Sequence, residues 1–370
     1  MKKSARWIPA LVVPAAVVAA AVVVPAVSAD ADVVLPEKTP QEVLALAASS
    51  TGTSFSGTVE QTSDLGLPEL PASGPGAGGD DATSQALELL TGTRTARVFA
   101  DGADRQRVQV VEELAERDLY RDGTSAWTWD SRTKEATHVS LPEQGARELP
   151  ATLPDGSAVP RTPAELADAL LAAVEPTTTV TATENARVAG RSAYQVVLTP
   201  DDPDTLVGGA VLTVDAETGL PLRVAVTAKG QSSPAFSVGF TDVDLTAPSD
   251  DVFAFTPPAG AEVTEVAAPT GAPREGAPAD RDHPAPTVLG SGWSTVVGVA
   301  AKSDDAPAEP GSGAERAGDA SDLLDQLTVP VDGGRVLQTA LLSVYLADDG
   351  QAWVGAVDAD ALRAAVADQR

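Results

Sequence analysis

The sequence contains no cysteine among its 370 residues. A disulfide framework is therefore excluded, although an exported protein would be permitted one, and the stability of the fold must come from a packed core. The absence of cysteine also excludes a thiol nucleophile, a thiolate metal site and a lipid-modified cysteine at the N-terminus.

Histidine is almost as scarce, because His138 and His283 are the only two in the chain. A histidine-activated nucleophile or a His-rich metal site cannot be assembled convincingly from these two residues, and no nucleophile elbow, phosphate loop or dinucleotide fingerprint is found. Paired acids at residues 201–202, 250–251 and 348–349 fall in predicted turns, where turn formation and solubility are favoured over calcium binding or acid/base chemistry. We therefore expect no enzymatic activity, no metal and no cofactor.

Basic residues are outnumbered by acidic ones, and the formal net charge is −28. Such a charge repels nucleic acid and anionic lipid head groups, so we expect no nucleic-acid partner. Solubility or adaptation to a salty exterior explains the excess of acids better than an acidic binding surface does.

A long apolar run occurs only at the N-terminus. Residues 1–6 include three basic side chains, residues 7–27 are almost entirely apolar, and Ser28 and Ala29 are small. This order predicts a cleaved signal peptide over residues 1–29. A retained membrane anchor is the alternative, because the run is long enough to span a bilayer, but its prolines and the lack of basic residues after it favour cleavage. Either reading places the remainder outside the cytoplasmic membrane.

Two capping boxes predict the helices that precede residue 260. The motif Thr-Pro-Gln-Glu at residues 39–42 and the motif Thr-Pro-Ala-Glu at residues 162–165 each combine an N-cap, a proline at the first helical position and a reciprocal glutamate. Apolar residues follow both motifs at helical spacing, so we expect helices over residues 40–50 and 163–175.

The remainder up to residue 260 reads as strands joined by short turns. Alternating or β-branched patterns predict strands near residues 55–59, 107–110, 119–121, 124–129, 177–183, 194–198, 206–214, 222–227 and 236–245, with Phe253 and Phe255 in a short closing segment. Residues 215–219 form a hairpin connection in which Gly219 supplies a positive φ. Consecutive strands with short connections indicate an antiparallel meander.

Composition divides the chain into a large unit over residues 30–266, a Pro/Ala-rich linker over residues 267–287 and a small C-terminal α+β unit over residues 288–370. In the small unit we expect strands at 293–299, 336–346 and 352–357, a loop at 302–318, a helix at 321–327 and a last helix that Asp358 caps and that runs through Val366. The fold class is thus α+β, mainly antiparallel β.

Trp127 and Trp129 lie two residues apart on a predicted strand and therefore face the same side of the sheet. A packed core and the wall of an apolar cavity explain this pair equally well. A meander of about ten strands has one long apolar face, and the two predicted helices are too few to cover it completely.

The order of elements resembles the LolA-type lipoprotein carriers and the related RseB/MucB envelope-stress regulators. The resemblance covers roughly residues 33–266 and rests on a leader, the capped helix before Gly52-Thr53-Ser54-Phe55, the Trp127-Thr128-Trp129-Asp130 strand, the second capped helix, the Asp215-to-Pro221 hairpin and the 236–258 stretch. It implies an incomplete β-barrel wrapped over a few helices, with an apolar cavity that shelters acyl chains. The carrier-specific arginine of the family cannot be placed on Arg94, Arg97, Arg105 or Arg107.

Two hypotheses follow. The first is a lipid or lipoprotein acyl-chain carrier in the cell envelope; its candidate cavity residues are Phe55, Val59, Val108, Val110, Trp127 and Trp129. The second is an RseB-like regulator that binds a membrane-anchored protein partner through residues 288–370, a stretch that faintly resembles the C-terminal domain of the RseB-like proteins. A hydrolase remains a remote third.

Overall fold

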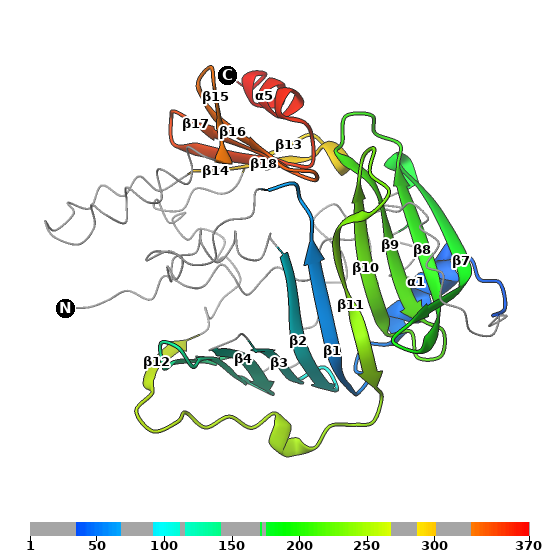
Figure 1. Cartoon of the computed structure of the whole chain (residues 1–370), viewed down its shortest axis with the longest axis vertical. Coiled ribbons are helices and arrows are strands. Elements are labelled where there is room, and N and C mark those ends of the chain that lie inside the picture. Colours follow the sequence, from blue (N-terminus) through cyan, green and yellow to red (C-terminus); the bar gives the residue numbers. More distant parts are fainter. Residues whose placement is uncertain are drawn as a thin grey trace, which may run out of the picture.

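The computed structural model describes residues 35–67, 92–111, 115–141, 171, 175–267, 287–300 and 327–369. Its largest element is a twelve-stranded sheet in the order β12-β6-β5-β4-β3-β2-β1-β11-β10-β9-β8-β7 (Figure 1). These strands are β1 Phe55–Ser63, β2 Gly92–Asp101, β3 Arg105–Val111, β4 Glu116–Asp122, β5 Ser125–Asp130, β6 Glu135–Ser140, β7 Thr178–Val188, β8 Arg191–Pro200, β9 Val207–Asp215, β10 Pro221–Ala228, β11 Pro234–Asp244 and β12 Glu262–Ala267.

The expected antiparallel meander is confirmed within two runs, β1 to β6 and β7 to β11. Two pairings depart from it. Strand β1 lies between β2 and β11, so it joins the two runs at the middle of the sheet. Strand β12 pairs with β6 in parallel and forms the outer edge. Because the edge strands β12 and β7 do not pair with each other, the sheet is an incomplete barrel, as predicted.

Helix α1 (Pro40–Ser49) begins at the predicted capping box. The backbone N–H of Glu42 donates to Thr39 Oγ1 at 3.3 Å, and the Glu42 carboxylate accepts from the backbone N–H of Thr39 at 2.7 Å. The helix packs on β7, β8 and β9, and Val43 is fully buried there. The helix predicted for residues 163–175 lies almost entirely outside the described residues.

The main core lies between α1 and strands β7–β11. Alternate residues of β8–β10, including Tyr194, Val196, Leu212 and Val226, point to the same side as Val43 and are buried. We call this side of the sheet the helix face. Within the described residues, none of the buried members of this core comes from β2–β6. The helix face is therefore well covered over one half of the sheet and less covered over the other.

The C-terminal unit has a six-stranded sheet and a core of its own. The sheet runs β13-β14-β18-β17-β16-β15, and helix α5 covers one face of it. The elements are β13 Thr287–Leu289, β14 Val296–Ala300, β15 Val329–Val331, β16 Gly334–Gln338, β17 Ser343–Ala347, β18 Gln351–Gly355 and α5 Ala359–Ala367. The N-cap predicted at Asp358 is confirmed, because its carboxylate accepts from two backbone N–H groups of the first turn.

One strand prediction in this unit was wrong. Residues 336–346 are not a single strand but β16 and β17, which pair with each other around a turn at 339–342. In that turn Thr339 Oγ1 accepts the backbone N–H of Leu342 at 3.0 Å, which bends the chain back. The loop and the helix predicted at 302–318 and 321–327 lie outside the described residues, except for Leu327.

The C-terminal unit is fixed to one end of the large sheet. Leu206 donates its backbone N–H to the carbonyl of Ala356 at 2.7 Å, and Trp293 Nε1 donates to Thr178 Oγ1 at 2.8 Å. Leu341 is buried within the main core. The described part of this unit is therefore joined to the large sheet by both hydrogen bonds and apolar packing.

The segment between β11 and β12, residues 245–261, was partly misread. Phe253 and Phe255 do not form a strand; Phe253 follows a short 3-10 turn (Asp250–Val252), and both residues lie in an extended crossing segment that we call the strap. Figure 1 shows the strap running beneath β3 and β4 from the end of β11 to β12.

Among the described residues, no helix has the length and apolarity needed to cross a membrane.

Candidate binding site on the helix face

Apolar side chains in register form the helix face of β1–β4. Val59 pairs with Ala96, and Ala96 pairs with Val110, so these three form one row across β1, β2 and β3. A second row joins Val98 and Val108 to Leu119, because each is opposite the next. Five of these six residues are valine or leucine and the sixth is alanine, and all six side chains are only partly buried. The result is a partly exposed apolar surface that extends across β1–β4.

Phe55 closes this surface at the β1–β11 junction. Its ring meets that of Phe240 edge to face, with centroids 5.6 Å apart. Gly57 makes room for this contact, because a Cβ atom there would lie 2.9 Å from Cδ1 of Phe240. The close approach of the Phe240 ring therefore explains why residue 57 is glycine.

Charged side chains flank the apolar rows on β4. Arg117 and Arg121 lie on either side of Leu119 on the helix face. Arg117 Nε is 3.3 Å from Asp130 Oδ2, and Arg121 pairs with Asp104 at 3.1 Å. Each guanidinium group is paired with a carboxylate, so neither adds an uncompensated positive charge beside Leu119.

The six predicted cavity residues divide between the two faces of the sheet. Phe55, Val59, Val108 and Val110 share the helix face. Val108 pairs with Leu119 on β4, and Leu119 pairs with Thr128 on β5, so Thr128 also lies on the helix face. Trp127 and Trp129 are the chain neighbours of Thr128, and they therefore lie on the opposite face. One face of the sheet therefore cannot present all six.

On the opposite face, which we call the strap face, the tryptophans contact the protein's own side chains. The ring of Phe255 from the strap lies 5.4 Å from that of Trp127 and 6.1 Å from that of Trp129, and it stacks on Tyr120 at 4.8 Å. His138 stacks on Trp127 at 4.3 Å. Sequence reasoning missed this cluster, although the alternation that placed the two tryptophans together also places Tyr120 across from Trp127.

A buried ion pair lies beside this aromatic cluster. Arg107 Nε donates to Asp118 Oδ1 at 2.9 Å, and the guanidinium lies 4.6 Å above the ring of Tyr120. Burial, together with a hydrogen bond to Glu116, raises the pKa of Asp118 to about 6, although Arg107 opposes this shift. Burial also raises the pKa of Tyr120 to about 12. A buried acid can mark a catalytic site, but here its partners are a structural arginine and a neighbouring carboxyl group.

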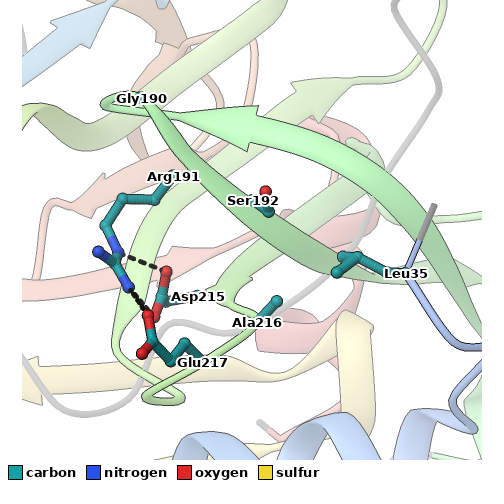
Figure 2. Close-up of a pocket in the computed structure, with 7 residues that line it drawn as sticks. All are labelled: Leu35, Gly190, Arg191, Ser192, Asp215, Ala216 and Glu217. Carbon is teal, nitrogen blue, oxygen red and sulfur yellow. Dashed lines mark hydrogen bonds and ion pairs between the residues drawn. The ribbon is translucent and has the colours of Figure 1, made fainter. Parts of the chain in front are cut away.

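A pocket of about 420 Å³ lies at the β8–β9 end of the sheet (Figure 2). Its polar wall is Arg191, which binds both oxygens of the buried Asp215 and also Glu217 at 2.9 Å. Asp215 further accepts the backbone N–H and the hydroxyl of Thr218, which fixes the hairpin predicted at 215–219. The charged side chains that line this pocket therefore stabilise the hairpin at residues 215–219.

The strand arrangement and the partly exposed helix face define an open half-barrel with an apolar surface. A family model described as predicted periplasmic proteins, DUF2092, matches residues 78–267, and the chain belongs to this family. No curated protein matches the sequence.

Solved structures of two kinds match this chain. The Pseudomonas aeruginosa MucA/MucB complex is 18% identical over 88% of this chain and 96% of that chain, with a TM-score of 0.43. A LolA superfamily protein from Nitrosomonas europaea is 13% identical over 59% of this chain and 99% of that chain, with a TM-score of 0.22. These are the two groups that the sequence resembles.

Proposed function

We propose that this chain is an extracytoplasmic carrier or binding protein that holds the acyl chain of a lipid or lipoprotein against the helix face of β1–β4. The observation that carries this proposal is the pair of apolar rows there, which are in register and only partly buried. Each methylene sheltered from water contributes ~0.8 kcal/mol, so an acyl chain can bind without a charged contact. No catalytic residue is required.

The location of the protein supports the same proposal. The family is described as periplasmic, and the predicted leader over residues 1–29 would direct the chain out of the cytoplasm. A protein that works in the water between or outside membranes must shield an acyl chain during transfer. A half-barrel with one apolar face provides such a shield.

Native mass spectrometry of protein purified without detergent, followed by lipid extraction, tests the proposal. Val110 and Val111 offer a matched pair, because they are consecutive on β3, but Val110 lies on the helix face and Val111 is 62% exposed on the other. We expect Val110→Asn to lose co-purifying lipid and Val111→Asn to retain it. An apo mass for the wild type that persists after incubation with fatty acid would contradict the proposal.

A second candidate function is binding of a membrane-anchored protein through residues 288–370. The observation in its favour is an apolar sheet face turned away from α5, where Val288 and Val299 are 61% and 49% exposed and Val354 is 37% exposed. A deletion of the unit would also remove Leu341 from the main core, so point changes are the better test. If this surface binds a partner, Val288→Thr/Val299→Thr should abolish co-sedimentation with envelope membranes, whereas Val111→Thr should not.

A further inference from the structure

The strap connects the middle of the large sheet to its outer edge. It leaves β11, which lies next to β1, and returns to β12, which lies beyond β6. To do so it crosses the strap face of the strands between them (Figure 1). The far half of the sheet is therefore held from behind by a covalent connection to the central strands.

Phe253 and Phe255, in the middle of the strap, attach it to the sheet. Phe255 inserts among Tyr120, Trp127 and Trp129, as described above. Phe253 is 2% exposed, and the guanidinium of Arg105 lies 5.5 Å over its ring. Arg105 also pairs with Asp250 of the strap and with Asp101 of β2. Aromatic stacking and an ion-pair cluster thus act together over a few residues.

The end of the strap is attached through β12. This strand pairs with β6 over its whole length, and His138 Nδ1 lies 2.7 Å from Glu265 Oε2. The other ring nitrogen of His138 is 3.0 Å from the hydroxyl of Ser125. The same histidine stacks on Trp127, so the edge contact and the aromatic cluster are continuous.

The strands that the strap touches also carry the proposed binding surface. Tyr120 on the strap face is the chain neighbour of Leu119 on the helix face, and the two tryptophans lie on either side of Thr128. Side chains alternate across a strand, so a shift of β4 or β5 on one face moves the residues of the other face by the same amount. The position of Leu119 relative to Val108 therefore depends on the contact made behind it.

We propose that the strap is a brace that positions β4 and β5, and that Phe255 is its positioning residue, so that loosening it from behind releases an acyl chain held in front. The release of an acyl chain rests on the proposed function, whereas the positioning of β4 and β5 by the strap does not. Phe255 touches the aromatic cluster and not the ligand, so its effect on binding is indirect.

The first test loosens the brace. Phe255→Ala removes the stacked ring, and Thr256→Ala changes the adjacent exposed residue as a control. With a dansyl-labelled fatty acid as probe, we expect Phe255→Ala to dissociate about fivefold faster than the wild type, the effect of one aromatic contact, and Thr256→Ala to be unchanged. Phe255→Leu, which keeps apolar bulk, should lie between them and covers the case in which the alanine variant folds poorly. Equal dissociation rates for all four proteins would overturn the proposal.

The second test tightens the brace. Thr137 and Thr264 are cross-strand partners on β6 and β12, and neighbouring strands are ~4.8 Å apart, which is compatible with a disulfide. Because the chain contains no cysteine, the intended bridge is the only intramolecular disulfide that Thr137→Cys/Thr264→Cys can form, and gel filtration isolates the monomer from any disulfide-linked dimer. We expect the oxidised protein to release the probe more slowly than either single variant, and reduction to restore the normal rate. An oxidised protein that releases the probe as fast as the reduced one contradicts release through the strap.

Amide hydrogen exchange separates the brace from the carrier function. The brace predicts faster exchange of β4–β6 in Phe255→Ala and slower exchange in the oxidised double variant, with β8–β10 unchanged, whether or not a lipid binds. A wild type that takes up no fatty acid, but shows these exchange differences, overturns the proposed function and leaves the brace. Unchanged exchange in β4–β6 overturns the brace, even if the wild type binds lipid.

Discussion

The guanidinium of Arg191 forms two hydrogen bonds with the carboxylate of Asp215, at 2.6 and 2.9 Å, across the ends of β8 and β9. Asp215 is 1% exposed, so its charge has left water. Burial raises its pKa, but Arg191 and the hydrogen bonds from Thr218 outweigh burial, so the pKa lies below its ordinary value. This pair fixes the turn that faces α1.

We predict that Arg191→Met destabilises the fold by about 2 to 4 kcal/mol at neutral pH, because it leaves a buried carboxylate without its cation. Since the folded pKa of Asp215 is lowered, the stability it contributes is present above the unfolded pKa and is lost as the pH falls through the folded one. The penalty should therefore shrink in acid. Urea unfolding at several pH values measures it, and Arg187→Met on the exposed end of β7 is the control; equal losses in both variants would contradict the prediction.

Gly219 and Gly230 separate backbone strain from steric overlap. Both have a positive φ, +79° and +78°, but a Cβ on Gly219 would overlap the carbonyl oxygen of Leu46 in α1, whereas the space around Gly230 is open. We expect Gly230→Ala to cost about 1 kcal/mol through strain alone and Gly219→Ala several times more. Thermal unfolding of both variants checks this, and similar losses would show that α1 does not press on the turn.

The raised pKa of Asp118 predicts a stability change in mild acid. A folded pKa of about 6 exceeds the ordinary value of ~3.9, so the contribution of the neutral carboxyl is complete below the ordinary value and is lost as the pH rises through about 6. Asp118→Asn should therefore gain stability relative to the wild type between pH ~4 and ~7. Asp242→Asn, an exposed control, should show no such trend. A constant difference between Asp118→Asn and the wild type would contradict the assignment.

Leu341 reports on how firmly the C-terminal unit is attached. It is 8% exposed and belongs to the core beneath β7–β11, although the turn that carries it connects β16 and β17 of the small sheet. We predict that Leu341→Ala costs about 2 to 4 kcal/mol and separates unfolding into two transitions, because the two sheets lose a shared side chain. Leu346→Ala, on the partly exposed face of β17, should leave one transition. Calorimetry distinguishes the two outcomes.

Local signals in the sequence predicted the local structure well. The capping box at residues 39–42, the N-cap at Asp358 and the Gly219 turn depend on residues within one turn of each other, and all three are confirmed. The open, mainly antiparallel sheet also followed from alternation and turn spacing. These features require no knowledge of distant partners.

The site was harder to predict because it depends on register across several strands. Val108 and Trp127 are separated by two turns, and one residue more or less in either would place them on the same face. The division of the six candidates between two faces therefore could not be read from the periodicity of each strand. The role of Phe255 was missed for a similar reason, since its partners lie more than a hundred residues earlier in the chain.

The central position of β1 has a consequence for how the chain reaches its fold. Its partner β2 follows within the same run, but its other partner, β11, arrives about 180 residues later, for example where Ser56 meets Asp244. Until then β1 presents an open edge with unpaired backbone groups, which can recruit another chain. The large sheet therefore cannot be completed before β11 is available, and the half-made sheet of β1–β6 is the species most exposed to association with other chains.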